Sequence, residues 1–197
     1  MQSKLRRDTQ SGFSLMELIV VIAVIALLAG AMTPFFSGVS QSGKVATFLK
    51  LYDSLKSACQ KHKIDAGTFA WEYNGYAASN RLLSGTQTYA GWKGPYIESP
   101  FTNGNNPFNQ TCGLHVYATA NPNSWIPAGW DLDADGTADV ASGTACNVLY
   151  MPCVSQAEAK EVDDAIDKGM GGTSGWATAG RVVYLSSSSI MLVLIAR

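Results

Sequence analysis

A run of nine residues in the second half of the chain gathers side chains of the kind that bind metal ions. It reads D-L-D-A-D-G-T-A-D, so four aspartates surround a single glycine. Calcium takes about six to eight oxygen ligands, and a glycine at the sixth position of its loop permits a sharp turn. The run therefore predicts a calcium site. Its candidate ligands are Asp131, Asp133, Asp135, Thr137 (through its backbone carbonyl) and Asp139.

The run departs from the EF-hand pattern, because its twelfth position is Ser142 instead of glutamate and no flanking helices are evident. It looks more like the helix-free calcium loops of extracellular proteins. The alternative is an acidic surface turn with Asp135-Gly136 at its tip, since Asp-Gly is a common turn pair. Four carboxylates this close together repel one another without a counter-ion, which favours calcium.

No group of side chains in the sequence predicts catalysis. His62 falls on an apolar helical stripe and His115 inside a strand candidate, so packing is the expected role of both. The sequence contains no G-x-S-x-G, phosphate-loop or H-E-x-x-H motif. A formal net charge of −1 gives no electrostatic footprint for nucleic acid. We therefore expect a protein that is not an enzyme and does not bind nucleic acid as a subunit.

An apolar stretch near the N-terminus determines how the topology of the remaining chain is interpreted. A bilayer-spanning helix needs about 20 apolar residues, and Phe13–Met32 has that length. Glu17 lies at the head of this stretch, although a carboxylate in an apolar environment needs a partner. A secretory signal peptide or a plain membrane anchor explains the apolar run but not Glu17.

Four residues fall at a spacing that is typical of one family. A short basic leader ends at Gly12, Phe13 follows, Glu17 comes four positions later, and Pro34 interrupts the helix. Over about Lys4–Thr47 the chain resembles type IV pilins and the related type II secretion pseudopilins. The resemblance implies cleavage after Gly12 by a prepilin peptidase, N-methylation of Phe13, and a kink at Pro34. It also implies a leader at 1–12, a membrane and filament-core helix at 13–43, and a globular head at 44–197.

The resemblance gives Glu17 a role in assembly. In a filament core, the carboxylate of one subunit can neutralise the Phe13 amine of a neighbour. A paired buried charge is penalised much less than an isolated one, so the pair would fix the axial register of subunits. The alternative is that Glu17 only reaches the head-group layer of the membrane.

The function that the resemblance implies is that of a structural subunit. Its partners would be identical subunits in a helical homopolymer, the prepilin peptidase and methyltransferase, and the inner-membrane assembly machinery. The chain would reside in the inner membrane first and in an extracellular pilus afterwards. Two alternatives stay open: a type II secretion pseudopilin of a periplasmic pseudopilus, and a membrane-anchored, calcium-dependent adhesin module. The sequence does not choose among adhesion, motility, DNA uptake, conduction and secretion.

The expected state of the four cysteines follows from this membrane topology. Everything beyond the apolar helix would lie in an oxidising compartment, where an even number of cysteines predicts disulfides. We expect a local Cys146–Cys153 bond, and a Cys59–Cys112 bond that fastens the helix to the head. A zinc site is the alternative, but the chain has no C-x-x-C pair.

The rest of the chain predicts an α+β fold in which a long N-terminal helix packs on a small antiparallel sheet, the pilin fold. An apolar stripe from Val45 to His62 has helical spacing, after a weak helical patch at Gly38–Gly43, and Gly67 suits the helix end. Ser155-x-x-Glu158 is a capping box for a helix through Ile166. Strands are expected at Leu114–Thr119, Asn147–Met151, Gly180–Leu185 and Ile190–Ala196.

The segment Thr68–Pro107 has no sustained periodicity, so it predicts a connecting region with turns and a short helix around Ala77–Leu83. Within it, Gly91–Ile97 is similar to a loop of pilins and pseudopilins. Trp92 and Tyr96 of that loop are either surface ligand-binding residues or a lid on the core.

Overall fold

The computed structural model divides the chain into two units, Met1–Ser40 and Gln41–Arg197. Helix α1 (Leu15–Ala66) contributes residues to both of them. The described residues are 15–73, 81–88, 90–120, 125 and 129–197, with side chains described at all of these except 29–40, 173 and 174. The expected leader at 1–12 lies outside these ranges.

The N-terminal unit contains the first part of α1. Its helical backbone continues without a break through Pro34 and through Gly38–Gly43, the weak patch in the sequence. The bend expected at Pro34, whose side chain lies outside the described ones, stays a prediction. Within the described residues, no helix has both the length and the apolar character that a membrane crossing requires.

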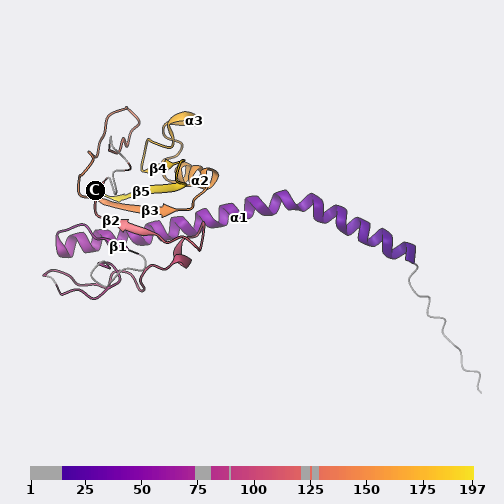
Figure 1. Cartoon of the computed structure of the whole chain (residues 1–197), viewed down its shortest axis with the longest axis horizontal. Helices are drawn as coiled ribbons and strands as arrows, with labels where there is room; N and C mark the ends of the chain where they lie inside the picture. The colour runs from indigo at the N-terminus through magenta and orange to yellow at the C-terminus, as the bar shows by residue number, and fades with distance from the viewer. Residues whose placement is uncertain (1–14, 74–80, 89, 121–124, 126–128) are drawn as a thin grey trace, which may run out of the picture. The chain divides into compact units, whose positions relative to one another are not determined.

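The head unit is built on a five-stranded antiparallel sheet in the order β1-β2-β3-β5-β4, which Figure 1 shows beside the second half of α1. Four strands lie where the sequence predicts them, and β5 is the buried strand between β3 and β4. The two-residue β1 was not predicted, because it is too short to show periodicity. The strand bounds are Glu72–Tyr73 (β1), His115–Tyr117 (β2), Asn147–Pro152 (β3), Val182–Leu185 (β4) and Ile190–Ala196 (β5).

One face of the sheet packs on the second half of α1, which confirms the α+β prediction. Alternate residues of β5 belong to this core, as Met191, Val193 and Ile195 do. The Tyr52 hydroxyl donates to the carbonyl of Leu194 at 3.2 Å, and Gly67, at φ +71°, closes the helix. The predicted stripe is buried at Val45, Phe48, Tyr52, Leu55, Cys59 and His62.

The opposite face of the sheet has its own core. Leu192 and Leu194 of β5 point to this side and pack with Trp130, which is completely buried. Trp130 belongs to the long connection between β2 and β3, so that connection covers the second face. The sheet is therefore buried on both sides around β5.

Helix α2 (Gln156–Ile166) begins at the predicted capping box, in which Ser155 and Glu158 exchange hydrogen bonds. Glu158 also pairs with Lys44 of α1 at 2.7 Å. At the other end, the Asp167 carboxylate accepts the backbone N–H groups of Arg181 (2.7 Å) and Val182 (2.9 Å). These contacts fix α2 between α1 and the start of β4. Two short helices, η2 (Asn103–Asn105) and α3 (Gly172–Gly175), complete the elements described.

The segment before β2 is held by polar contacts instead of a regular element. Residues 81–83 of the predicted short helix form a bridge and a turn, and 77–80 lie outside the described residues. The buried Glu72 carboxylate accepts the backbone N–H of Leu83 at 3.0 Å. The Trp92 indole donates to Leu82 and the Tyr96 hydroxyl to Asp65, both at 3.1 Å. The Tyr96 ring packs against the core on the α1 face of the sheet, and the Trp92 ring meets Tyr96 edge-on at 6.1 Å. Tyr96 therefore acts as a lid on the core, with Trp92 beside it.

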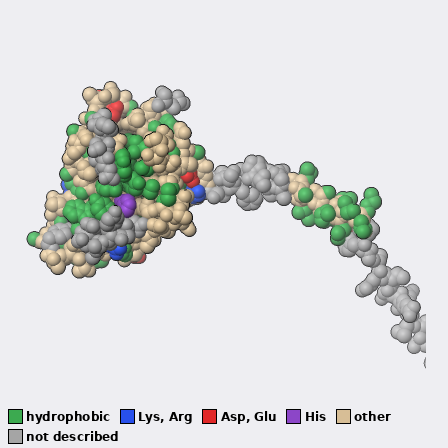
Figure 2. Space-filling view, viewed as in Figure 1, with side chains coloured by type: hydrophobic (Ala, Val, Ile, Leu, Met, Phe, Trp, Pro, Cys, Tyr) green, Lys and Arg blue, Asp and Glu red, His purple; other side chains and the backbone are tan. Residues whose placement is uncertain are grey.

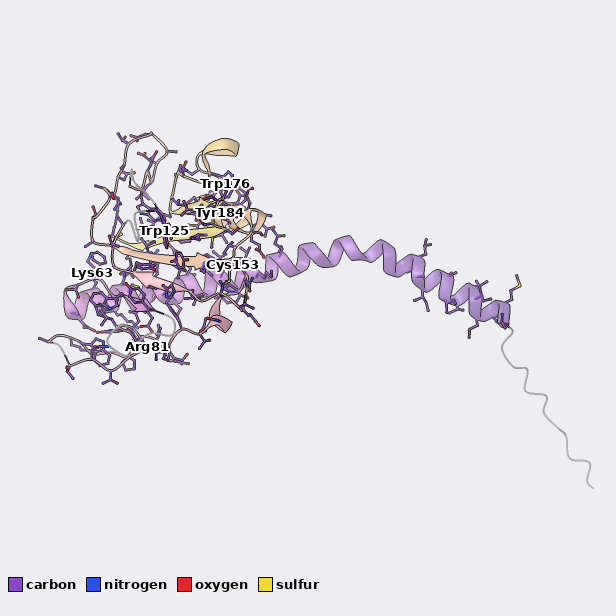
Figure 3. All side chains as sticks on the ribbon, viewed as in Figure 1. Lys63, Arg81, Trp125, Cys153, Trp176 and Tyr184 are labelled. Carbon is purple, nitrogen blue, oxygen red and sulfur yellow. A yellow bond between two sulfur atoms is a disulfide. The ribbon has the colours of Figure 1, made fainter. Side chains whose placement is uncertain are left out.

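The predicted disulfide pairing is wrong. Cys112 bonds to Cys153 (labelled in Figure 3), whereas Cys59 and Cys146 are free and buried. The reason is that Cys59 lies in the core on the α1 face of the sheet and Cys146 in the core on the opposite face. Neither thiol reaches the surface, where the loop before β2 meets the end of β3.

Asp163 of α2 gives the head a pH-dependent stability. Its side chain is fully buried, with the Lys160 ammonium 3.4 Å from one oxygen. Burial raises the pKa of this carboxyl from its ordinary 3.8 to about 6. Between pH 3.8 and about pH 6, the Asp163 carboxyl is therefore protonated in the native state but ionised in the unfolded chain. The free energy of unfolding therefore falls as the pH rises through this window and stays lower above it.

We expect Asp163→Asn to raise the free energy of unfolding at neutral pH by about 2 kcal/mol and to flatten its fall between about pH 4 and 6. Asparagine keeps the shape of the side chain but carries no charge. Urea unfolding of the full chain across this range measures the effect. The exposed neighbour Asp164→Asn is the matched control, and equal pH profiles for both variants and the wild type would contradict the assignment.

Candidate functional site

Residues 15–28 of α1 expose their large apolar side chains, and Figure 2 shows hydrophobic side chains on the surface of this part of the helix. Leu15 is 77% exposed, Met16 76% and Leu27 75%, and the intervening large side chains are exposed by half or more. A helix that is apolar on every side is normally buried against protein or lipid. Glu17 is the sole charged residue between Leu15 and Leu28, and it lies in the first turn. This surface calls for a partner that covers it.

The structure describes part of the predicted processing and assembly set. Glu17 lies in the first turn of α1, and Gly12 and Phe13 fall outside the described residues. Their roles stay predictions.

The aspartate run forms a closed loop on the head. Its ends are clamped by Trp130 and Val140, whose backbones exchange hydrogen bonds of 2.9 and 3.1 Å. The Trp130 indole is buried and donates to the carbonyl of Ala120 at 2.6 Å. Sequence reasoning missed this clamp, and the apolar residues that flank the aspartates were the signal for it.

Three of the predicted calcium ligands come together inside this loop. Carboxylate oxygens of Asp131, Asp133 and Asp139 all lie within 4.8 Å of one another. The Gly136 N–H donates to Asp131 at 2.8 Å, and the positive φ of Gly136 (+89°) permits that turn. The Leu132 N–H donates to Asp139 at 2.8 Å and the Asp135 N–H to Asp133 at 3.2 Å, so backbone groups orient all three carboxylates. The other oxygen of Asp131 is buried and has no hydrogen-bond partner among the described residues.

Asp135 and Thr137 lie at the tip of the same loop. Asp135 accepts the backbone N–H of Thr137 at 2.7 Å and also the Thr137 hydroxyl. These bonds lower the pKa of the Asp135 carboxyl. Asp135 is not one of the three converging acids, and a contribution from the Thr137 carbonyl stays a prediction. The donor set is all oxygen and anionic, which fits a hard cation such as calcium.

Comparison with known proteins supports the resemblance of the N-terminus. Residues 7–33 match the family described as the prokaryotic N-terminal methylation motif. The chain is 30% identical over 90 residues to a fimbrial protein of Neisseria meningitidis serogroup B. It is 28% identical over 90 residues to a fimbrial protein of Neisseria meningitidis serogroup A. Both findings support a type IV pilin.

The aligned part is limited in extent. It covers 46% of this chain and 48% of each fimbrial protein, so the chain spans about half the length of the curated relatives it matches. No solved structure gives a significant match.

Proposed function

We propose that the chain is a structural subunit of a type IV pilus. The observation that carries the proposal is an N-terminal methylation motif at the start of a helix whose apolar side chains are exposed all around. Packing such helices against one another would remove that surface from water, which is the main driving force of association. In this proposal the role is structural and not enzymatic.

The proposed pathway begins with a leader, residues 1–12, that a prepilin peptidase removes after Gly12. Phe13 then becomes the methylated N-terminus, and residues 13–43 wait in the inner membrane until the assembly machinery draws the subunit into a surface filament. Glu17 neutralises the Phe13 amine of a neighbour there. The fimbrial names of the relatives favour a pilus over a secretion pseudopilus.

Electron microscopy of sheared cell-surface material, with peptide identification, tests this function. We expect filaments that contain this chain, with methylated Phe13 at the N-terminus. Gly12→Ser should abolish both cleavage and filaments, because the peptidase needs the glycine. Gly43→Ser, a matched glycine change beyond the processing site, should leave processing intact. Normal filaments from Gly12→Ser cells, or only short periplasmic forms in the wild type, would contradict the pilus proposal.

A calcium ion held by the aspartate loop is a second part of the proposal. Asp131, Asp133 and Asp139 would bind it, and the unpartnered oxygen of Asp131 supports a cation there. The ion would neutralise the loop, which the Trp130–Val140 clamp and a hydrogen bond from Gly180 to the Asp131 carbonyl (2.7 Å) join to the sheet.

We expect saturating calcium to raise the melting temperature of the full chain by about 5 °C relative to chelator, from a binding energy of about 2 kcal/mol. Asp133→Asn should lose most of this difference. Asp164→Asn, an exposed acid on α2, should keep it. Equal melting temperatures with calcium and with chelator in the wild type would contradict calcium binding and favour an acidic surface turn.

A further inference from the structure

An open groove on the head, between α1 and α2, carries two cations. We call it the α1–α2 groove. Its apolar lining includes Leu49 of α1 and Ile166 of α2, which are only partly buried. Lys56 of α1 and Arg181, which precedes β4, also line it. Neither cation forms an ion pair with a described residue.

The lining of this groove has an excess of positive charge. Asp53 is its one acid among the described residues, so two positive side chains face one negative side chain. Burial raises the pKa of the Tyr52 hydroxyl and the Arg181 guanidinium acts in the opposite direction, so the guanidinium lies beside that hydroxyl. The buried Asp167 carboxylate binds the backbone N–H of Arg181. The groove is therefore complementary to an anionic side chain from outside.

A second copy of this chain carries an acid that suits the groove. Glu98 is exposed on the segment before η2, and it forms no ion pair with a described residue. It lines a different groove, in which Leu51 and Ser54 represent α1.

The two grooves lie on opposite sides of α1. Successive residues of a helix are turned by about 100°, so Leu49, Asp53 and Lys56 face one side of α1. Leu51 and Ser54 are turned to the other side. Figure 1 likewise shows α2 and η2 on opposite sides of this part of α1. A contact between two different surfaces is heterologous, and it can repeat from copy to copy along a filament.

We propose that Glu98 of one subunit docks into the α1–α2 groove of the next, where Lys56 and Arg181 bind its carboxylate. This inference rests on the proposed function, because the filament brings the heads together. The planar guanidinium suits a carboxylate, and the apolar lining keeps water away from the pair. Helix packing would still drive assembly, whereas this contact would fix how neighbouring heads are oriented.

Exchange of charges in cells tests this docking. Glu98→Lys sets a cation against the groove, so we expect about tenfold fewer filaments than in the wild type. Lys56→Glu should have a similar effect, because its lining then has one positive and two negative side chains. The two changes together should restore the yield to within about twofold of the wild type, since paired residues are not additive.

Lys50 provides the matched control, because it is an exposed lysine of α1 outside the lining of the groove. Lys50→Glu should not restore filaments to Glu98→Lys cells. Immunoblotting of the processed subunit separates assembly from folding and processing. Wild-type yields from both single variants, or equal restoration by Lys50→Glu, would overturn the docking and leave the pilus proposal intact. A wild type without filaments would contradict both.

Cross-linking of sheared filaments tests the docking with all charges in place. Ser99→Cys and Ala165→Cys put exposed thiols beside Glu98 and in the groove. With both changes in one chain, a short bis-maleimide should give a ladder of multimers. The two free native thiols are buried and should not react. Ser99→Cys with Ser187→Cys, beyond the far end of β4, should stay monomeric. Monomers alone from the groove pair, or an equal ladder from the control pair, would overturn the docking.

Discussion

Replacing Glu17 by alanine is expected to abolish filaments while leaving a processed subunit in the membrane. The variant removes the sole carboxylate from the apolar first turns of α1. In the proposed filament core, the Phe13 amine of every neighbour would then be buried without a partner. Leaving one member of a buried ion pair unpaired destabilises by about 3–5 kcal/mol. That penalty recurs at each subunit, so the polymer should fail to form.

The control for this experiment is a conservative change at the same position. Glu17→Asp keeps the charge and should retain some filaments, with a lower yield because the shorter side chain reaches less far. Immunoblotting of membrane fractions reports processing, and microscopy of sheared material reports assembly. Wild-type numbers of filaments from Glu17→Ala cells would refute the pairing, whereas an unprocessed product would show that Glu17 acts in cleavage instead.

The elements of the head that carry a strong local pattern were predictable from the sequence. Ile190–Ile195 is too short to span a bilayer and too apolar for a surface, and it forms the buried strand β5. The capping box at Ser155 and Glu158 marked the start of α2 correctly. Both predictions rest on chemistry within a few residues, which tertiary contacts did not override.

The features that sequence reasoning missed depend on contacts between distant residues. Strand β1 consists of two residues and exists because Glu72 and Tyr73 pair with β2. The rings of Tyr73, His115 and Tyr150 likewise come from distant parts of the chain, and the cross-strand register aligns them in one row. The aspartate run was visible as a pattern, but which of its acids converge depended on the turn at Gly136 and the clamp at Trp130.

The disulfide pairing also depends on tertiary contacts that the sequence does not show. Four cysteines allow three pairings, and spacing cannot choose among them. The choice follows from which thiols the core buries: Cys59 on the helix stripe and Cys146 at the start of β3. Burial raises the pKa of the Cys59 thiol to about 12 and that of the Cys146 thiol to about 12. Both should therefore be unreactive in the native protein.

Loss of the Cys112–Cys153 bond should be the largest single change in the stability of the head. The bond spans 41 residues, and opening a loop of that length gives the unfolded chain about 4 kcal/mol of additional conformational freedom. We therefore expect a reductant, or the double variant Cys112→Ser with Cys153→Ser, to lower the free energy of unfolding by that amount. Urea unfolding of the full chain with and without reductant measures it.

The free thiols provide the internal control for this measurement. Cys59→Ala should respond to reductant as the wild type does, since Cys59 forms no disulfide, and the Cys112–Cys153 double variant should not respond at all. Peptide mapping without reduction should find Cys112 linked to Cys153. A Cys146–Cys153 or Cys59–Cys112 peptide would instead restore the pairing that spacing alone suggested. Such a peptide would contradict the structure, because Cys59 or Cys146 could form that bond only after leaving the core in which it is buried.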